Sequence, residues 1–276
     1  MTQLVLITGA TGFVGRQVYK WLISQKISVR IVARKENVEQ IVVSEYLESI
    51  VTTNDMFAES EAWWAKVCIG VDTVIHLAWY VEQGKYLESV KNLDCVVGTL
   101  ALAKGASSAG IRRFIGVGTC FEYDLTQAKN ITVDAPLNPI TVYAGAKVAT
   151  YFSLNSWFSL RQIEFTWCRL FYLYGEGEDP RRLVAYIRKM LELGEQVKLT
   201  SGNQIRDFMD VSDAGEMIVK VALSNVQGQV NICSGVPITI KTLAERIADE
   251  YGRRDLLKFG ARPENLIDPP FIVGVR

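Results

Sequence analysis

Three side chains near the middle of the chain have the chemistry to move a proton at a carbonyl group. Tyr143 and Lys147 are four residues apart, so they share one face of the helix expected over Val142 to Leu160, and Thr119 ends an expected strand. A phenol donates or accepts a proton, a nearby ammonium is expected to bring the phenol pKa toward the working pH, and a hydroxyl can stabilise an oxyanion. The Tyr/Lys spacing alone is a weak signal. The alternatives are a half-buried aromatic and a strand-end hydroxyl without catalytic roles.

Three glycines, Gly9, Gly12 and Gly15, follow the apolar run Leu4 to Ile7 at intervals of three residues. After a buried strand this spacing allows a tight turn, a close backbone approach to a pyrophosphate and close packing of the helix that begins at Phe13. The motif therefore predicts a dinucleotide, and a glycine-rich turn without a ligand is the alternative. A mononucleotide P-loop is excluded, because no Gly-Lys-Ser/Thr sequence closes the turn.

The end of the second expected strand, Ser28 to Ala33, indicates which dinucleotide binds. An acidic residue at this place would accept hydrogen bonds from the ribose 2′-hydroxyl. The chain has Arg34 there, and a guanidinium pairs with a 2′-phosphate that a carboxylate would repel. We therefore predict NADP(H). NAD is the alternative, with Arg34 and Lys35 as solvated loop charges.

Apolar, strand-like runs alternate with helix-length amphipathic segments through the first two thirds of the chain. Continuous apolar strands separated by helices predict an α/β fold with a Rossmann-type, doubly wound parallel sheet. Ligands bind beyond the carboxyl ends of such strands, so chemistry is expected near Gly9, Leu77, Thr119 and Leu170. The expected strands are Leu4–Ile7, Ser28–Ala33, Ser49–Thr53, Thr73–Leu77, Phe114–Val117 and Glu164–Leu170, and the expected helices are Phe13–Gln25, Leu87–Ser108 and Val142–Leu160.

From about Gly175 the pattern changes to short strands mixed with helices, which predicts a smaller C-terminal α/β lobe over the carboxyl edge of the sheet. We expect residues 1–174 to form the coenzyme-binding domain that carries the catalytic residues. Residues 175–276 are expected to form mainly a substrate-binding lobe, with return segments to the core near 208–232. The expected elements here are strands 197–199, 208–211 and 229–232 and helices 181–193, 213–223 and 240–251.

Composition and charge argue against several classes of protein. Thirty basic and thirty acidic residues balance without a basic run, so nucleic acid is not expected as a partner. No segment is long and apolar enough to span a membrane, and Leu4–Ile7 lacks the basic leader of a signal peptide. The five cysteines are scattered without a C-x-x-C pair, which argues against disulfides and a metal site and for a reducing cytoplasm.

Taken together, these motifs resemble the extended short-chain dehydrogenase/reductase family, also called the NAD-dependent epimerase/dehydratase family. The segments that carry the resemblance are Thr8–Gly15, Asp72–Ala78, Asn92 with Gly98-Thr99, Thr119–Tyr123, Tyr143 with Lys147, and Arg206-Asp207-Phe208. The resemblance implies an NAD(P)-dependent oxidoreductase with Tyr143 as acid/base, Lys147 on the nicotinamide ribose and Thr119 on the substrate oxygen. It implies coenzyme contacts at Gly9, Thr11, Gly12, Phe13, Val14, Gly15, Arg34, Asp55, Leu77, Ala78, Tyr143 and Lys147.

Members of this family act largely on nucleotide sugars, as dehydratases, epimerases or ketoreductases. Sugar dehydratases carry Thr-Asp-Glu at this strand end, whereas this chain has Thr119-Cys120-Phe121, and Phe121 cannot transfer a proton. Residues 76–79, 84–87 and 119–124 are similar to bacterial reductases of nucleotide-linked 4-keto-6-deoxyhexoses, the CDP-abequose synthase type of O-antigen pathways. The resemblance therefore implies an NADPH-dependent 4-ketoreductase of a nucleotide-diphosphate sugar.

The same resemblance implies where the substrate binds. Arg206 stands where relatives grip the substrate pyrophosphate, and Tyr172 stands where they commonly place Asn beside the substrate phosphates. Tyr80, Glu82 and Tyr86 are further candidates for the wall of the sugar pocket, with plain packing as the alternative. Substrate contacts are expected at Trp79, Thr119, Cys120, Tyr172 and Arg206.

Other functions differ from this prediction in ways that can be tested. A 4-epimerase with tightly held NAD needs only Thr119, Tyr143 and Lys147, and a non-catalytic NADP-binding sensor could share the fold. A serine or cysteine hydrolase is not expected, because the chain has one histidine, His76, and no Gly-x-Ser-x-Gly sequence. We expect His76 to be structural. The resemblance alone implies a homodimer through the helices expected over 87–108 and 142–160.

Overall fold

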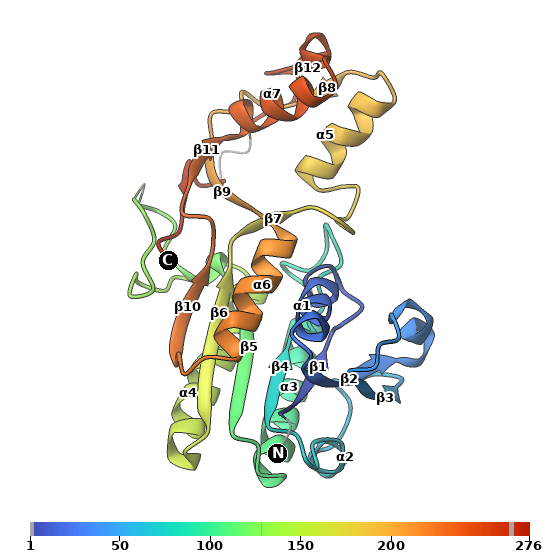
Figure 1. The fold of residues 1–276 in the computed structure, drawn as a ribbon. Coiled ribbons are helices and arrows are strands. Elements are labelled where there is room, and N and C mark those ends of the chain that lie inside the picture. The colour runs from blue at the N-terminus through green and yellow to red at the C-terminus, as the bar shows by residue number, and fades with distance from the viewer. Residues whose placement is uncertain (1–2, 128, 265–267) are drawn as a thin grey trace.

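The centre of the molecule is a seven-stranded parallel sheet in the order β10-β6-β5-β4-β1-β2-β3 (Figure 1). The computed structural model describes residues 3–127, 129–264 and 268–276. The strand order reverses between β4 and β1, so a ligand crevice is expected at the carboxyl ends of these two strands. The strands are β1 (Leu4–Thr8), β2 (Ser28–Arg34), β3 (Leu47–Thr53), β4 (Thr73–His76), β5 (Arg113–Thr119), β6 (Glu164–Leu170) and β10 (Gly228–Ile232).

Helices cover both faces of the sheet, because its strands are apolar on both sides; β5 is buried at every residue. On one face α1 and α6 pack against the sheet through residues such as Val18 and Ile218. On the other face α2, α3 and α4 pack through residues such as Leu102 and Phe158. These helices are α1 (Phe13–Ser24), α2 (Glu61–Val67), α3 (Lys91–Ser108), α4 (Val142–Arg161) and α6 (Val211–Ala222), with the 3-10 turns η1 (Lys35–Gln40) and η2 (Cys120–Glu122).

The C-terminal lobe lies beyond the carboxyl ends of the sheet strands (Figure 1). In its main sheet β9 pairs with β7, β11 and β13, and β9 runs directly into α6, which lies on the central sheet. The lobe has its own small core, formed largely by α5 and α7. Its elements are β7 (Tyr172–Tyr174), α5 (Leu183–Glu192), β8 (Val197–Lys198), β9 (Ile205–Asp210), β11 (Pro237–Thr239), α7 (Ile240–Glu250), η3 (Arg254–Leu256), β12 (Leu257–Lys258) and β13 (Phe271–Ile272).

The predicted Rossmann-type fold class is confirmed, while some element boundaries were wrong. Helix α3 begins at Lys91 and not at Leu87. The Leu87 carbonyl accepts a hydrogen bond from the Tyr143 N–H at 2.9 Å, and the Asn92 side chain donates to the Tyr86 and Ser89 carbonyls, so tertiary contacts hold this segment as a turn. Helix α2 and the short strands β7, β11, β12 and β13 were not predicted.

Within the described ranges, no helix is long and apolar enough to cross a membrane. The same residues contain no group of three or more His, Cys, Asp or Glu side chains arranged to hold a metal ion.

Candidate active site

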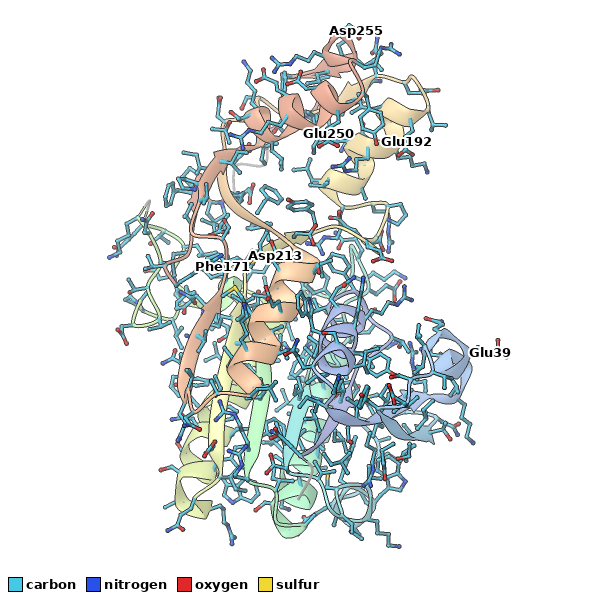
Figure 2. The ribbon with its side chains drawn as sticks, in the orientation of Figure 1. Glu39, Phe171, Glu192, Asp213, Glu250 and Asp255 are labelled. Atoms are coloured by element: carbon cyan, nitrogen blue, oxygen red, sulfur yellow. The ribbon has the colours of Figure 1, made fainter. Side chains whose placement is uncertain are left out.

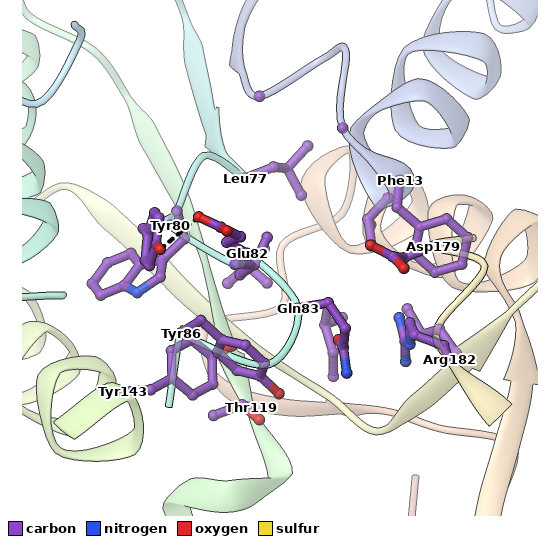
Figure 3. A pocket seen from close by; sticks show the side chains of 18 of the residues that line it. Phe13, Leu77, Tyr80, Glu82, Gln83, Tyr86, Thr119, Tyr143, Asp179 and Arg182 are labelled. Carbon is purple, nitrogen blue, oxygen red and sulfur yellow. Dashed lines mark hydrogen bonds between the residues drawn. The ribbon is translucent and has the colours of Figure 1, made fainter. Parts of the chain in front are cut away.

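One cavity of about 1480 Å³ lies at the carboxyl ends of the sheet strands and is also lined by residues of the lobe (Figure 3). Every residue that the sequence analysis assigns to coenzyme, catalysis or substrate lines it. The structure therefore brings the whole predicted set together, and the individual roles stay predictions. These residues are Gly9, Thr11, Gly12, Phe13, Val14, Gly15, Arg34, Asp55, Leu77, Ala78, Trp79, Thr119, Cys120, Tyr143, Lys147, Tyr172 and Arg206.

The turn after β1 is too tight for a side chain at two of its glycines. A Cβ at Gly15 would lie 2.0 Å from the Gly9 oxygen, and a Cβ at Gly9, where φ is +76°, would lie 2.7 Å from the Ala78 nitrogen. Helix α1 begins at Phe13 with Gly12 as N-cap, no side-chain cap and no acidic residue in its first turn. An uncapped helix N-terminus at a cavity attracts an anion. These residues fit the pyrophosphate of a dinucleotide.

The rim of the cavity carries one cation and one carboxylate of the predicted coenzyme set. The Arg34 side chain at the end of β2 is 56% exposed, and its Nη1 lies 3.1 Å from Glu36 Oε1. The Asp55 carboxylate accepts a hydrogen bond from the Phe57 N–H at 3.0 Å. Exposed ion pairs hold their partners weakly, so the Arg34 guanidinium is available to an anionic ligand at the rim.

Helix α4 carries Tyr143 and Lys147 into the cavity. Thr141 caps the helix by accepting a hydrogen bond from the Ala144 N–H at 3.1 Å, which places Tyr143 in the first turn. Both side chains are buried. Lys147 Nζ donates to the Val117 carbonyl at 2.7 Å and lies 3.6 Å from the centroid of the Trp79 ring. Figure 3 shows Tyr143 beside Thr119, with the side chain of Tyr86 next to the Tyr143 ring.

Thr119 ends β5 and begins the turn η2. Its Oγ1 accepts a hydrogen bond from the Phe121 N–H at 3.3 Å, and Glu122 Oε1 accepts one from the Thr119 N–H at 2.8 Å. This capping box satisfies the backbone and leaves the Thr119 hydroxyl proton available to the cavity. A donor at this place can stabilise an oxyanion.

Burial favours the neutral forms of Tyr143 and Lys147 and shifts their pKa values accordingly. It raises the pKa of Tyr143 above its ordinary value, although the Thr119 side chain acts in the opposite direction. It lowers the pKa of Lys147 to about 7, against the Glu122 carboxylate, which raises it. Lys147 Nζ lies 6.0 Å from the Tyr143 ring centroid. The expectation that its ammonium brings the phenol toward its charged form applies to the coenzyme complex and stays a prediction.

His76 is held inside the sheet, away from proton transfer. Its Nδ1 lies 2.7 Å from Thr8 Oγ1 and its Nε2 lies 2.8 Å from Thr99 Oγ1. Burial lowers the pKa of His76 to about 3, with a further lowering by the charge of Lys147. The imidazole is therefore neutral at physiological pH and bridges β1, β4 and α3, as a structural residue would.

Two of the predicted substrate residues, Tyr172 and Arg206, lie on the lobe side of the cavity. The buried Arg206 guanidinium lies 5.5 Å from the Tyr172 ring centroid, and its Nη2 lies 2.7 Å from Asp268 Oδ2. Tyr172 meets Phe121 edge-on, with ring centroids 6.1 Å apart. Burial raises the pKa of Cys120 to about 12, so its thiol stays protonated. Cys120 therefore lines the cavity as a thiol and does not act as a nucleophile.

A sequence model described as the NAD dependent epimerase/dehydratase family matches residues 5–233. The chain belongs to this family. It is therefore an NAD(P)-dependent enzyme of the oxidoreductase type, as the glycine turn and the Tyr/Lys pair indicate.

Relatives of this family member cover nearly its whole length. The dTDP-6-deoxy-L-talose 4-dehydrogenase (NAD(+)) of Aggregatibacter actinomycetemcomitans is 25% identical over 275 residues, which is 99% of both chains. The UDP-glucose 4-epimerase of Mycolicibacterium smegmatis is 26% identical over 92% of this chain and 84% of its own. The solved UDP-N-acetylglucosamine 4-epimerase of Methanobrevibacter ruminantium shares the fold, with a TM-score of 0.88, 21% identity and coverage of 100% and 90%.

Two further side chains touch the catalytic set of this family member. Tyr86 contacts the Tyr143 ring edge-on with centroids 4.9 Å apart and lines the cavity, and its place in the wall of the sugar pocket stays a prediction. Glu122 was assigned no role, although it binds the Thr119 N–H. The sequence signal that could have found Glu122 is the spacing Thr-x-x-Glu at the strand end, which is a capping box.

Proposed function

We propose that the chain is an NADPH-dependent reductase of a nucleotide-linked 4-keto-6-deoxyhexose. The observation that carries the proposal is the meeting of Thr119, Tyr143 and Lys147 in one cavity, with Phe121 at the position where a dehydratase needs an acid. Phe121 lies against the ring of Tyr172 and has no proton to give. Tyr143 is thus the proposed proton donor for one carbonyl oxygen, which is what a reduction requires, and position 121 offers no second acid.

The coenzyme would be held by Gly9, Gly12 and Gly15 at its pyrophosphate, by Arg34 at its 2′-phosphate and by Lys147 at its nicotinamide ribose. Bound NADPH supplies a hydride to the carbonyl carbon. Tyr143 donates its phenolic proton to the carbonyl oxygen, and the raised pKa of Tyr143 keeps that proton in place before the reaction. Thr119 donates a hydrogen bond to the same oxygen, and the Lys147 ammonium stabilises the phenolate that remains until it takes a proton from solvent.

The relatives and the lobe support the proposed substrate class. The dTDP-6-deoxy-L-talose 4-dehydrogenase relative, whose name gives a deoxyhexose and position 4, matches along 99% of the chain. Arg206 is a buried guanidinium that lines the cavity and suits a diphosphate. We therefore propose that residues 1–174 hold the coenzyme and the proton donor, and that residues 175–276 mainly bind the nucleotide part of the sugar nucleotide. The abequose-synthase type is the finer form of this proposal.

A 4-epimerase with bound NAD is the second candidate. Two observations favour it: the Glu36 carboxylate beside Arg34 would repel a 2′-phosphate, and the relatives include UDP-glucose 4-epimerase. An epimerase uses the same phenol to remove and return one proton, so the catalytic set fits both reactions. The two candidates differ in whether the coenzyme is consumed.

The deciding experiment incubates the purified protein with NADPH and a panel of CDP-, dTDP-, UDP- and GDP-linked 4-keto-6-deoxyhexoses while the NADPH absorbance is followed. We expect stoichiometric oxidation of NADPH with one member of the panel and a new hydroxyl at C4 of the product, and oxidation at least about 10²-fold slower with Tyr143→Phe. Interconversion of UDP-hexoses at C4 without net loss of coenzyme would instead establish the epimerase.

A further inference from the structure

Glu122 is a buried acid that the proposed reaction does not use. Its side chain is fully buried, although the preceding residue, Phe121, lines the cavity. The turn η2 thus directs two successive side chains to different places. Phe121 faces the ligand site, whereas Glu122 points behind the end of β5 toward β6 (Glu164–Leu170).

The surroundings of Glu122 accept a carboxylate. Among the described residues, its two oxygens only accept hydrogen bonds. They accept from the Thr119 N–H at 2.8 Å, the Trp167 indole N–H at 3.1 Å and the Arg169 Nε–H at 2.6 Å. Burial raises the pKa of Glu122, and the Arg169 guanidinium opposes this. A protonated acid would turn an O–H toward one of these donors, so the charged form satisfies the site better.

Lys147 lies near the same strand end. Its Nζ donates to the Val117 carbonyl at 2.7 Å, two residues before Thr119, and lies 5.9 Å from the centroid of the Trp167 ring whose N–H binds Glu122. Two opposite charges thus flank one indole inside a buried layer, where solvent screens them little. The Glu122 charge raises the pKa of Lys147 while burial lowers it.

We propose that Glu122 is a positioning residue whose carboxylate keeps the Lys147 amine protonated in its buried site. The use of that charge in catalysis rests on the proposed function; the coupling of the two groups does not. The Arg169 guanidinium holds the Glu122 carboxylate in place. The guanidinium is itself held by a hydrogen bond from its Nη1 to the Tyr123 hydroxyl at 3.0 Å. Removing the carboxylate leaves Arg169 and Lys147 as two buried cations without a counter-charge.

Several other groups face this pair and stay in place in the experiments below. His76 is neutral and the cysteines are thiols, because burial lowers the pKa of His76 to about 3 and raises that of Cys95 to about 11. The titratable and charged side chains that face Glu122 or Lys147 are His76 on β4, Cys95 on α3, Cys120 on η2, Tyr123 after η2, Tyr143 and Tyr151 on α4, and Arg169 on β6.

The test is a titration of the protein without coenzyme or substrate, labelled with ¹³C-lysine and followed by NMR, with Lys147→Met to identify the Lys147 signal. Glu122→Gln is expected to lower the pKa of Lys147 by about one unit, a tenfold loss in proton affinity, because a counter-charge is removed. Glu122→Asp keeps the charge and is expected to restore most of this shift. A merely structural role for Glu122 predicts the opposite sign, because loosened packing admits water and raises the pKa of Lys147.

The matched control is Glu164→Gln, the same substitution at the far end of β6, where Glu164 pairs with Arg113. It is expected to leave the pKa of Lys147 unchanged. If Glu122→Gln does not fold, the reciprocal measurement decides, because coupling between two sites is mutual. Lys147→Met must then raise the pKa of Glu122, seen in ¹³C-glutamate spectra.

An unchanged or raised pKa of Lys147 in folded Glu122→Gln, or an unchanged pKa of Glu122 in Lys147→Met, overturns the proposal. Because no substrate is present, a failure of this titration leaves the reductase proposal standing, and the absence of reductase activity leaves the coupling standing. In the active enzyme, Glu122→Gln is further expected to move the alkaline loss of kcat to lower pH, since Lys147 then loses its proton at lower pH.

Discussion

The central sheet and the C-terminal lobe hold their charged groups in different ways. In the sheet, the strands β4 and β5 are buried at every residue, and the acid of the pair Glu122–Arg169 is locked by three donors. In the lobe, strands are two to six residues long, and ion pairs such as Arg188–Glu250 and Arg253–Asp255 lie at the surface, whereas Arg206 at the cavity is buried. Figure 2 shows Glu192, Glu250 and Asp255 on the outer part of the lobe.

The two regions therefore meet different requirements of the proposed reaction. A proton donor must stay within hydrogen-bond reach of the carbonyl, so Tyr143, Thr119 and Lys147 sit on elements fixed by the largest cores of the molecule. Exposed ion pairs contribute little to stability, so the lobe can change its surface without unfolding the sheet. Reactions within the family can therefore differ in the lobe while the catalytic set stays in place.

The largest expected effect concerns the sheet. Tyr143→Phe removes the proposed proton donor but keeps the ring against Tyr86, so kcat is expected to fall by at least about 10²-fold while the Kd for NADPH is unchanged. Steady-state kinetics and a fluorescence titration with NADPH measure the two quantities. Unchanged turnover rules out the acid role and removes the functional contrast between the two regions.

A change in the lobe is expected to act on substrate binding alone. Arg206→Lys keeps the charge but loses the planar, bidentate guanidinium, so KM for the sugar nucleotide is expected to rise about tenfold with kcat nearly unchanged. The same substitution at Arg253, on the lobe surface and paired with Asp255, is the control and should leave KM as it is. A fall in kcat at constant KM would contradict the assignment of Arg206 to the substrate.

A change at the rim of the sheet combines features of these two cases, because Arg34 belongs to the sheet strand β2 but is exposed. Arg34→Ala is expected to raise the Kd for NADPH about fivefold and to leave the Kd for NADH unchanged. Lys35→Ala, at the next residue, is the matched control. Equal affinities for the two coenzymes in the unaltered protein would favour the epimerase.

The smallest expected effect is a pH-dependent loss of stability inside the sheet. The pKa of His76 is lowered from 6.5 to about 3 by burial, so the unfolded chain binds a proton that the folded chain does not take up between these values. Stability therefore falls as pH decreases from about 6.5 toward 3. By pH 6 the loss is about 0.8 kcal/mol relative to pH 8.

His76→Asn removes this titration and keeps a polar side chain between Thr8 and Thr99. Urea unfolding at several pH values measures the difference between the two proteins. If the difference in the free energy of unfolding between the two proteins does not vary with pH, the folded protein accepts a charged His76. The interior of the sheet would then be as accessible to water as the lobe.

Local patterns predicted the fold class, the glycine turn and the Tyr/Lys pair, while the family resemblance implied the other members of the candidate site. Apolar runs of four to seven residues, the glycines after β1 and the i, i+4 pair on α4 are signals carried by neighbouring residues, because each depends on the repeat of one strand, turn or helix. The short strands of the lobe carry no such repeat. β13 has two residues and forms by pairing with β9, where Phe271 pairs with Ile205, 66 residues earlier in the chain, so no local pattern could find it.

The protonation of the site depended on contacts that no local pattern contains. Glu122 meets Trp167 and Arg169, which are 45 and 47 residues away, and Tyr143 and Lys147 are desolvated by several elements at once. Residue type and spacing could name the phenol, the amine and the hydroxyl. The direction of their pKa shifts, and the acid behind them, followed from burial, which is a sum over all neighbours in space and exists once the whole chain has folded.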